Sequence, residues 1–282
     1  MSTLLEPFQY EFFVRALIVA TVSGALCGLI GVYVVLRGMS YIGHGLSHAI
    51  FGGAVASYIV GINVFVGAGA WGLLAALFIN RVARRRSIGA DAAIGAITSA
   101  SFAIGIILIS VQGTFVVNFE ALLWGNVLGV SPADVVIVLL VGAASAAFVF
   151  FGYRSLLFST FDPEVAEVSG VRTGRVDLML AVMLTATIAA TMNVLGVTMI
   201  AAILVIPPVI ARLLTDSFGR MLWISVGAGT LCGFVGVYGS YYLDWSSGGT
   251  VVLAAAALFL AAFAWSGLRG RGLPRGAAIG SH

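Results

Sequence analysis

The sequence predicts an all-α polytopic membrane protein of about nine transmembrane helices, with eight to ten as the range. Of its 282 residues 61% are hydrophobic and only 9% are charged, and the mean hydropathy is +1.11. A soluble fold is excluded because the chain has too few polar residues to cover a water-exposed surface. Apolar runs also recur at about the 20-residue length that one helical bilayer crossing needs. We therefore expect a single membrane domain over residues 1–282.

Nine apolar runs, separated by Arg, Asp, Gly and Pro, mark the expected spans. The connections between them are short, so no separate extramembrane domain is expected. Residues 276–282 are small and polar and are typical of a tail added during cloning. The expected spans are 13–36, 46–60, 62–80, 92–111, 133–152, 174–193, 196–214, 220–241 and 249–267.

The basic residues predict the orientation of the chain. All 14 of them are arginines, and every one except Arg15 falls on one side when alternate connections are assigned to the cytoplasm, starting after the first span. Basic residues favour the cytoplasmic side of a membrane. We therefore expect a multi-pass protein of the cell membrane with its N-terminus outside and its C-terminus in the cytoplasm.

The absence of lysine excludes several enzyme classes. A P-loop ATPase and a pyridoxal phosphate enzyme both need a lysine, so any ATP used by this protein is hydrolysed by a partner chain. No CxxC, HExxH or plausible Ser-His-Asp arrangement is present. The arginines are scattered, which argues against nucleic acid. We expect contact with the lipid bilayer, no enzymatic activity and no tightly bound cofactor.

Residues 114–130 do not fit the pattern of full crossings. They are too few to cross twice, and Glu120 and Asn126 lie among apolar residues. A short segment of this kind is tolerated at membrane depth only where protein or water covers its backbone. The stretch predicts a re-entrant or interfacial helix on the outer side.

Residues 155–171 form a polar cytoplasmic loop with the signals of a short helix. Asp162 is a suitable N-cap, Pro163 suits the first helical position and Glu164 lies in the first turn, while Gly170 can end the helix. A capped helix in a cytoplasmic loop predicts a surface on which a partner protein binds.

His44 and His48 are the strongest candidates for a binding site. Four residues of separation places their imidazoles on one helix face, about 6 Å apart, where both can bind one divalent metal. If Arg37 and Gly61 mark the two membrane interfaces, the run 46–60 covers only about 22 Å at 1.5 Å per residue. This predicts an unwound stretch followed by a half-helix that begins inside the membrane, as in many transporter sites.

The alternative is structural: both histidines could bond to neighbouring backbone or to Ser47 and hold a glycine-rich turn. Ionisable residues inside a bilayer are costly and usually functional, and the pair at helical spacing favours metal ligation. Because zinc takes about four ligands, a symmetric homodimer would supply the remaining two imidazoles.

Five further residues are weaker candidates for a gate or hinge. Met192, Asn193 and Met199 flank the outer turn between the sixth and seventh spans, where a thioether or amide could contact a passing ion, although packing alone also explains them. Pro207 and Pro208 are expected to break the seventh helix. That break would be either a hinge or a simple bend.

Five segments in order carry a family resemblance. Together they resemble the permease subunit of the zinc/manganese/iron ABC importers (metal ABC transporter permease, ABC-3 type), from about residue 10 to 267. The segments are VVLRGMSYIGHGLSHAIFGG, GADAAIGAITSASFAIGI, FDPEVAEVSGVR, LGVTMIAAILVIPPVIARLL and SSGGTVVL.

The resemblance implies an ABC importer permease fold and a set of partners. These are two cytoplasmic ABC ATPase subunits, an extracytoplasmic metal-binding protein of the cluster A-I type, and a second copy of the permease. It also implies that Phe161, Asp162, Pro163 and Glu164 belong to the coupling helix that lies in a groove of the ATPase.

The same resemblance suggests the transported ion. His48 resembles a histidine that is a metal ligand in the translocation path of the family. The family commonly has an acidic residue four positions before that histidine, whereas this chain has His44 there. Imidazole suits zinc while manganese favours some carboxylate, so Zn²⁺ is expected as substrate, then Mn²⁺, then Fe²⁺. The alternatives are a permease for an iron chelate or siderophore, with a wider path, and an ATP-independent channel or secondary carrier, which would carry buried carboxylates.

Overall fold

The computed structural model describes residues 5–83, 90–112, 123–126 and 129–268. Within these ranges the chain is helical and has no strand, which confirms the all-α polytopic fold class. Most of residues 114–130, where a re-entrant or interfacial helix is expected, and all of residues 276–282 lie outside the described residues.

The described part of the chain contains nine long helices, in agreement with the nine predicted spans. Eight are long and apolar enough to cross a membrane; the ninth, α3, carries the two histidines. The elements are η1 (Glu6–Gln9), α2 (Glu11–Leu36), α3 (Ser40–Val60), α4 (Val64–Ala83), α5 (Ala90–Gln112), α7 (Pro132–Phe161), α8 (Pro163–Val168), α9 (Thr173–Leu195), α10 (Val197–Leu214), α11 (Phe218–Leu243) and α12 (Ser247–Leu268).

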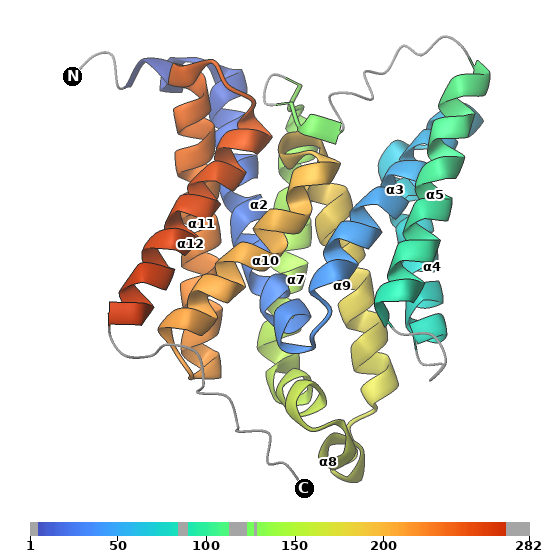
Figure 1. Ribbon diagram of the computed structural model, residues 1–282. Helices are drawn as coiled ribbons and strands as arrows, with labels where there is room; N and C mark the ends of the chain where they lie inside the picture. The colour runs from blue at the N-terminus through green and yellow to red at the C-terminus, as the bar shows by residue number, and fades with distance from the viewer. Residues whose placement is uncertain (1–4, 84–89, 113–122, 127–128, 269–282) are drawn as a thin grey trace, which may run out of the picture.

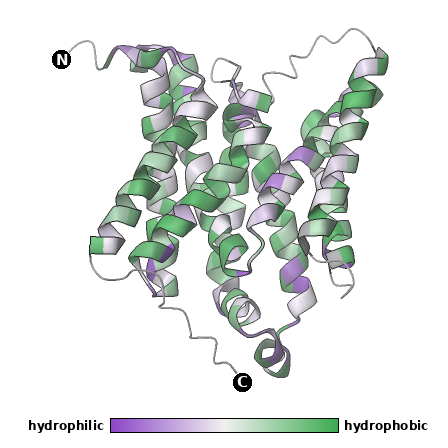
Figure 2. Cartoon of the chain, in the orientation of Figure 1, coloured by the Kyte–Doolittle hydropathy of each residue, from purple (hydrophilic) through white to green (hydrophobic). Residues whose placement is uncertain are grey.

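Helix α2 is the most buried of these eight apolar helices, with 67% of its most apolar 18-residue window inside the protein. It packs against α7, α9, α10 and α11, whereas α3, α4 and α5 pack against one another beside it (Figure 1). Most of the helical ribbon in Figure 2 has the colours of hydrophobic residues. The short helix α8 projects beyond the ends of α7 and α9 (Figure 1).

Helices α2 and α11 approach each other closely along a line of glycines. A Cβ atom added to Gly24 or to Gly229 would lie 2.1 Å from the carbonyl oxygen of the other residue. One turn away, the Ser225 hydroxyl donates a 2.7 Å hydrogen bond to the Gly28 carbonyl oxygen. Small residues let two helix backbones approach to this distance, and we call this contact the α2–α11 seam.

The predicted break at Pro207 and Pro208 is wrong, because α10 runs without interruption from Val197 to Leu214. A proline at position 208 leaves the carbonyl of Leu204 without its usual helical partner. That carbonyl faces Gly31 of α2, where an added Cβ would lie 2.0 Å from the oxygen. The freed carbonyl thus lies in the close contact between α10 and α2, and a hinge role for the two prolines stays a prediction.

Helix α7 is longer than predicted, since it continues to Phe161 instead of ending at residue 152. The first seven residues of the predicted 155–171 loop are therefore helical. The polar residues in this stretch do not end the helix because they have partners: the Ser159 and Thr160 hydroxyls both accept hydrogen bonds from Arg37, the C-cap of α2. Leu156, on the same stretch, is fully buried.

Candidate functional site

Both histidines lie in the continuous helix α3, which begins at Ser40, six residues before the predicted start of this span. The predicted unwound stretch before a half-helix is therefore wrong. Gly38, whose φ of +66° is left-handed and suits a glycine, reverses the chain between α2 and α3 within three residues. This tight reversal lets α3 start early, and Figure 1 shows its first turn part-way along α9.

The two imidazoles meet on one face of α3, as the four-residue spacing predicts. Their ring centroids are 4.6 Å apart and their planes are inclined by 75°. His44 is exposed in the single chain and His48 is half-buried. Because a zinc–nitrogen bond is about 2.0 Å long, rings at this separation are within reach of one shared ion.

The surroundings of His48 leave polar atoms without partners. Its ring packs on Phe102 of α5 at a centroid distance of 4.9 Å. The Nδ1 atom of His48 is buried and makes no hydrogen bond. The same is true of the hydroxyl of Thr98, which like Phe102 belongs to α5. The Ser47 hydroxyl donates to the backbone carbonyl of His44 and not to either ring. Since buried polar atoms normally have partners, an unpartnered imidazole nitrogen fits a site that binds a passing ion.

Within one chain the pair does not make a complete metal site. Among the described residues, no group of three or more His, Cys, Asp or Glu side chains is placed to hold a metal. Two imidazoles leave coordination positions open, which suits an ion that must be bound and then released.

Three of the weaker candidates, Met192, Asn193 and Met199, lie at the turn between α9 and α10, at the end opposite α8 (Figure 1). Met192 is 1% exposed, and Met199 is half-buried in the first turn of α10. Asn193 donates a 2.7 Å hydrogen bond from its side-chain Nδ2 to the carboxylate of Asp134. The backbone carbonyl of Asn193 accepts a hydrogen bond from the backbone N–H of Asn126. The structure thus gives Asn193 a bonding role at this turn, while a gating role stays a prediction.

Asp134 is a structural residue that the sequence analysis did not identify. It forms a capping box with Ser131 at the start of α7, and its Oδ2 atom accepts from the Ser131 N–H and hydroxyl at 2.8 and 2.7 Å. The sequence signal was available, because a serine followed three residues later by an acidic residue is a known helix-start pattern.

Replacing Asp134 by alanine is expected to destabilise the protein by about 1–3 kcal/mol, because it removes the cap and leaves the Asn193 amide without its acceptor. The thermal unfolding midpoint in detergent measures the effect. Asp216→Ala, in the exposed α10–α11 connection, is the control and should leave the midpoint unchanged. An unchanged midpoint for Asp134→Ala would contradict this role.

The structure confirms the predicted short helix at residues 163–168. The Asp162 carboxylate accepts a 3.0 Å hydrogen bond from the Val165 N–H, Pro163 occupies the first turn with Glu164, and Gly170, with a φ of +81°, follows its end. Phe161 is 58% exposed and its ring contacts Phe218 of α11 at 5.8 Å.

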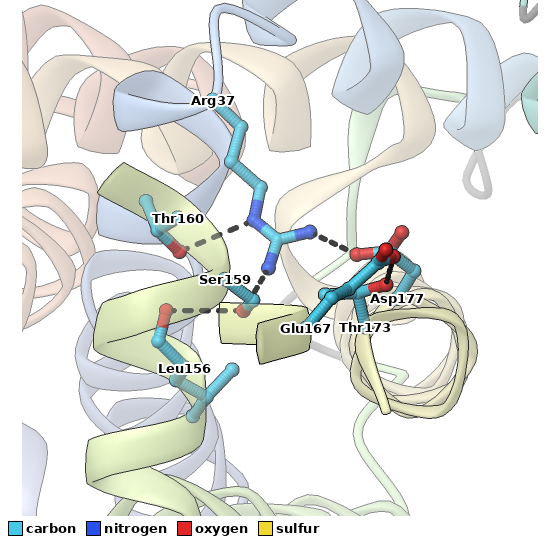
Figure 3. A network of polar contacts seen from close by, with 7 residues as sticks. All are labelled: Arg37, Leu156, Ser159, Thr160, Glu167, Thr173 and Asp177. Atoms are coloured by element: carbon cyan, nitrogen blue, oxygen red, sulfur yellow. Dashed lines mark hydrogen bonds and ion pairs between the residues drawn. The ribbon is translucent and has the colours of Figure 1, made fainter. Parts of the chain in front are cut away.

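Arg37 joins three helices next to α8 (Figure 3). Its guanidinium donates to Thr160 Oγ1 at 3.3 Å and Ser159 Oγ at 2.9 Å, both on α7, and forms an ion pair with Asp177 on α9. The sequence analysis treated Arg37 only as a marker of the interface. An aspartate inside an apolar run, such as Asp177, was the signal that a buried partner exists.

The comparison with protein families decides the membership of the chain. The ABC 3 transport family model matches residues 9–266. The chain belongs to the ABC 3 transport family. This confirms the resemblance read from the sequence, and the members similar to this chain are membrane permease subunits rather than enzymes.

Individual ABC 3 relatives match along nearly their whole length. The manganese transport system membrane protein MntC of Halalkalibacterium halodurans is 35% identical, over 94% of this chain and 91% of that protein. The chelated iron transport system membrane protein YfeC of Yersinia pestis is 34% identical, over 93% and 89%. The solved structure of PsaBC from Streptococcus pneumoniae in complex with Fab is 33% identical, covers 93% and 95%, and has a TM-score of 0.85.

These comparisons establish a metal ABC importer permease. The two named relatives carry manganese and chelated iron in their names, so the expected preference for zinc does not follow from them. Membership of an ABC family also favours ATP-driven transport over the ATP-independent channel or carrier.

Proposed function

We propose that this ABC 3 permease imports a divalent metal ion, with His44 and His48 as ligands in its path. The observation that carries the proposal is the imidazole pair on α3, with ring centroids 4.6 Å apart and an unpartnered Nδ1 atom on His48. The N-terminus faces outside and the C-terminus faces the cytoplasm. An extracytoplasmic binding protein of the cluster A-I type delivers the ion.

The ligand chemistry favours Zn²⁺ first, then Mn²⁺, then Fe²⁺. Two neutral imidazoles suit zinc, and manganese prefers at least some carboxylate oxygen. His44 is exposed in the single chain, so a second copy of the permease can bring its own pair to the same ion. A homodimer then offers four imidazoles, the number of ligands zinc commonly takes.

ATP is hydrolysed by two partner ATPase subunits that bind at α8. The exposed apolar side chains of Val165 and Val168, which are 47% and 91% exposed, give such a partner a hydrophobic contact surface. The neighbouring Phe161, Asp162, Pro163, Glu164 and Gly170 fix the shape of this coupling helix.

The test is metal uptake by the complete transporter in lipid vesicles. His44→Ala combined with His48→Ala is expected to lower zinc uptake at least about tenfold, because even losing a group that merely supports a ligand commonly costs that much. Ser47→Ala on the same helix removes the bond to the His44 carbonyl and should leave uptake intact. Uptake by the double variant within about twofold of the parent, with normal assembly, would reject the role of the histidines.

The name of YfeC favours a second candidate substrate, an iron chelate. The same vesicles distinguish the two, since a chelate permease would take up a preformed iron chelate and leave free zinc and manganese ions outside.

A further inference from the structure

The coupling helix α8 is suspended between the last turn of α7 and the first turns of α9. The Asp162 N–H bonds to the Phe158 carbonyl of α7 at 2.9 Å. On the other side the Thr173 hydroxyl donates a 2.6 Å hydrogen bond to Glu167 of α8 (Figure 3). A push on α8 therefore reaches both of these helix ends directly.

Arg37 bonds to both of those helix ends at once. Ser159 and Thr160 belong to the last turn of α7, and Asp177 lies in the second turn of α9. The Arg37 side chain is only 12% exposed, so water screens these bonds little. A planar guanidinium with donors in several directions is suited to hold two helices in a fixed relation.

Arg37 is also attached to the start of the histidine-bearing helix. It is the C-cap of α2, and only Gly38 and Met39 separate it from α3. The Gly38 and Met39 N–H groups donate hydrogen bonds to the backbone carbonyls of Val35 and Val34. These bonds restrict movement of the connection between α2 and α3. His44 lies four residues after the first residue of α3, Ser40, which is about one helical turn.

A cavity lies where the first turn of α3 would move. Its volume is about 140 Å³, and Arg37 and Asp177 are part of its wall. Met39, the N-cap of α3, and Ile42 in its first turn line one side, and Leu180 lines it from α9. Because close-packed interiors resist displacement, such a space permits a shift of α3 that a filled interior would prevent.

We propose that Arg37 is a positioning residue that transmits movement of α8, through α7 and α9, to α3 and its histidines. The proposal rests on the proposed function, because it assumes that an ATPase acts on α8. The alternative is a purely structural role, in which Arg37 only holds three helices together. The two readings differ in whether ATP hydrolysis still drives metal uptake after the contact is removed.

The test variant is Arg37→Met combined with Asp177→Asn, which removes both charges and so leaves no single charge buried. It is reconstituted with its ATPase and binding protein. We expect hydrolysis within about twofold of the parent and uptake at least about tenfold lower, as for a lost coupling between two sites. Arg212→Met, an exposed arginine in the last turn of α10, is the control and should retain both activities.

A fluorescent reporter on α3 reads the movement itself. Tyr41 is 67% exposed, whereas Cys27 and Cys232 are fully buried, so an environment-sensitive thiol label on Tyr41→Cys reports on α3. ATP should shift its emission in the parent and in Arg212→Met, and the shift should disappear in the Arg37/Asp177 double variant. This signal needs no transported metal, so it stands or fails independently of the histidine proposal.

Two results would overturn the proposal. One is an emission shift and an uptake that both persist in the double variant. If the double variant does not assemble, Arg37→Lys is measured in its place, because it keeps the charge but loses the fork geometry. This variant is expected to lower the uptake per ATP hydrolysed. The second overturning result is an unchanged ratio of uptake to hydrolysis in Arg37→Lys, which would leave Arg37 with a structural role only.

Discussion

Replacing Gly229 by valine is expected to leave no correctly folded permease. At this position an added Cβ would lie 2.1 Å from the carbonyl oxygen of Gly24. The oxygen belongs to the backbone of α2, and the position of a Cβ is fixed by its own backbone, so neither atom can rotate away. The two helices would have to separate along the whole α2–α11 seam. Overpacking of a core commonly costs about 1–3 kcal/mol, and we expect this backbone clash to exceed that range. Recovery of monodisperse protein by size-exclusion chromatography in mild detergent measures the result.

The same helix provides the control for this prediction. Gly227 lies two residues away on the exposed side of α11, and an added Cβ there would meet nothing within 4 Å. Gly227→Val has the same change in volume and helix propensity, and it should be recovered like the parent. Equal recovery of the two variants would show that the close approach of α2 and α11 does not limit folding.

Replacing His44 by aspartate is expected to shift the transported ion from zinc toward manganese. The substitution exchanges one imidazole nitrogen for carboxylate oxygen, which manganese favours. The ratio of zinc to manganese uptake, measured in the same vesicles, is expected to fall at least about tenfold. The rest of α3, including His48 and its contact with Phe102, is unchanged.

His44→Asn is the matched control, because asparagine has nearly the shape of aspartate without its charge. This variant should lower the uptake of both ions without favouring manganese. A His44→Asp protein with an unchanged ratio would mean that the ion is selected elsewhere, for example by the binding protein that delivers it.

The sequence predicted the nine spans well, because length and hydropathy are what a bilayer demands of a helix. It placed several ends wrongly for one physical reason. Polar residues such as His44 and Arg154 were taken as ends of spans. A membrane helix makes its backbone hydrogen bonds internally, so it continues past a polar side chain that has a suitable environment. The start of α3 and the end of α7 were both misplaced in this way.

For the site, the spacing of His44 and His48 sufficed to predict a shared helix face. It could not predict the packing of His48 on Phe102 or its unpartnered nitrogen, because these depend on how α5 lies against α3. The bond between Arg37 and Asp177 joins residues 140 positions apart. Contacts at such separation come from the tertiary arrangement, which local pattern does not specify.

The close contacts of α2 restrict how this permease can alternate between open states. Gly24 lies against Gly229 of α11, and Gly31 lies against the Leu204 carbonyl of α10, so a sliding movement of α2 along either neighbour would bring backbone atoms into collision. We therefore expect α2, α10 and α11 to move as one unit when access to the two sides of the membrane changes. The helices α3, α4 and α5, which pack against one another beside that unit, are then the part expected to move relative to it, together with the two histidines of α3.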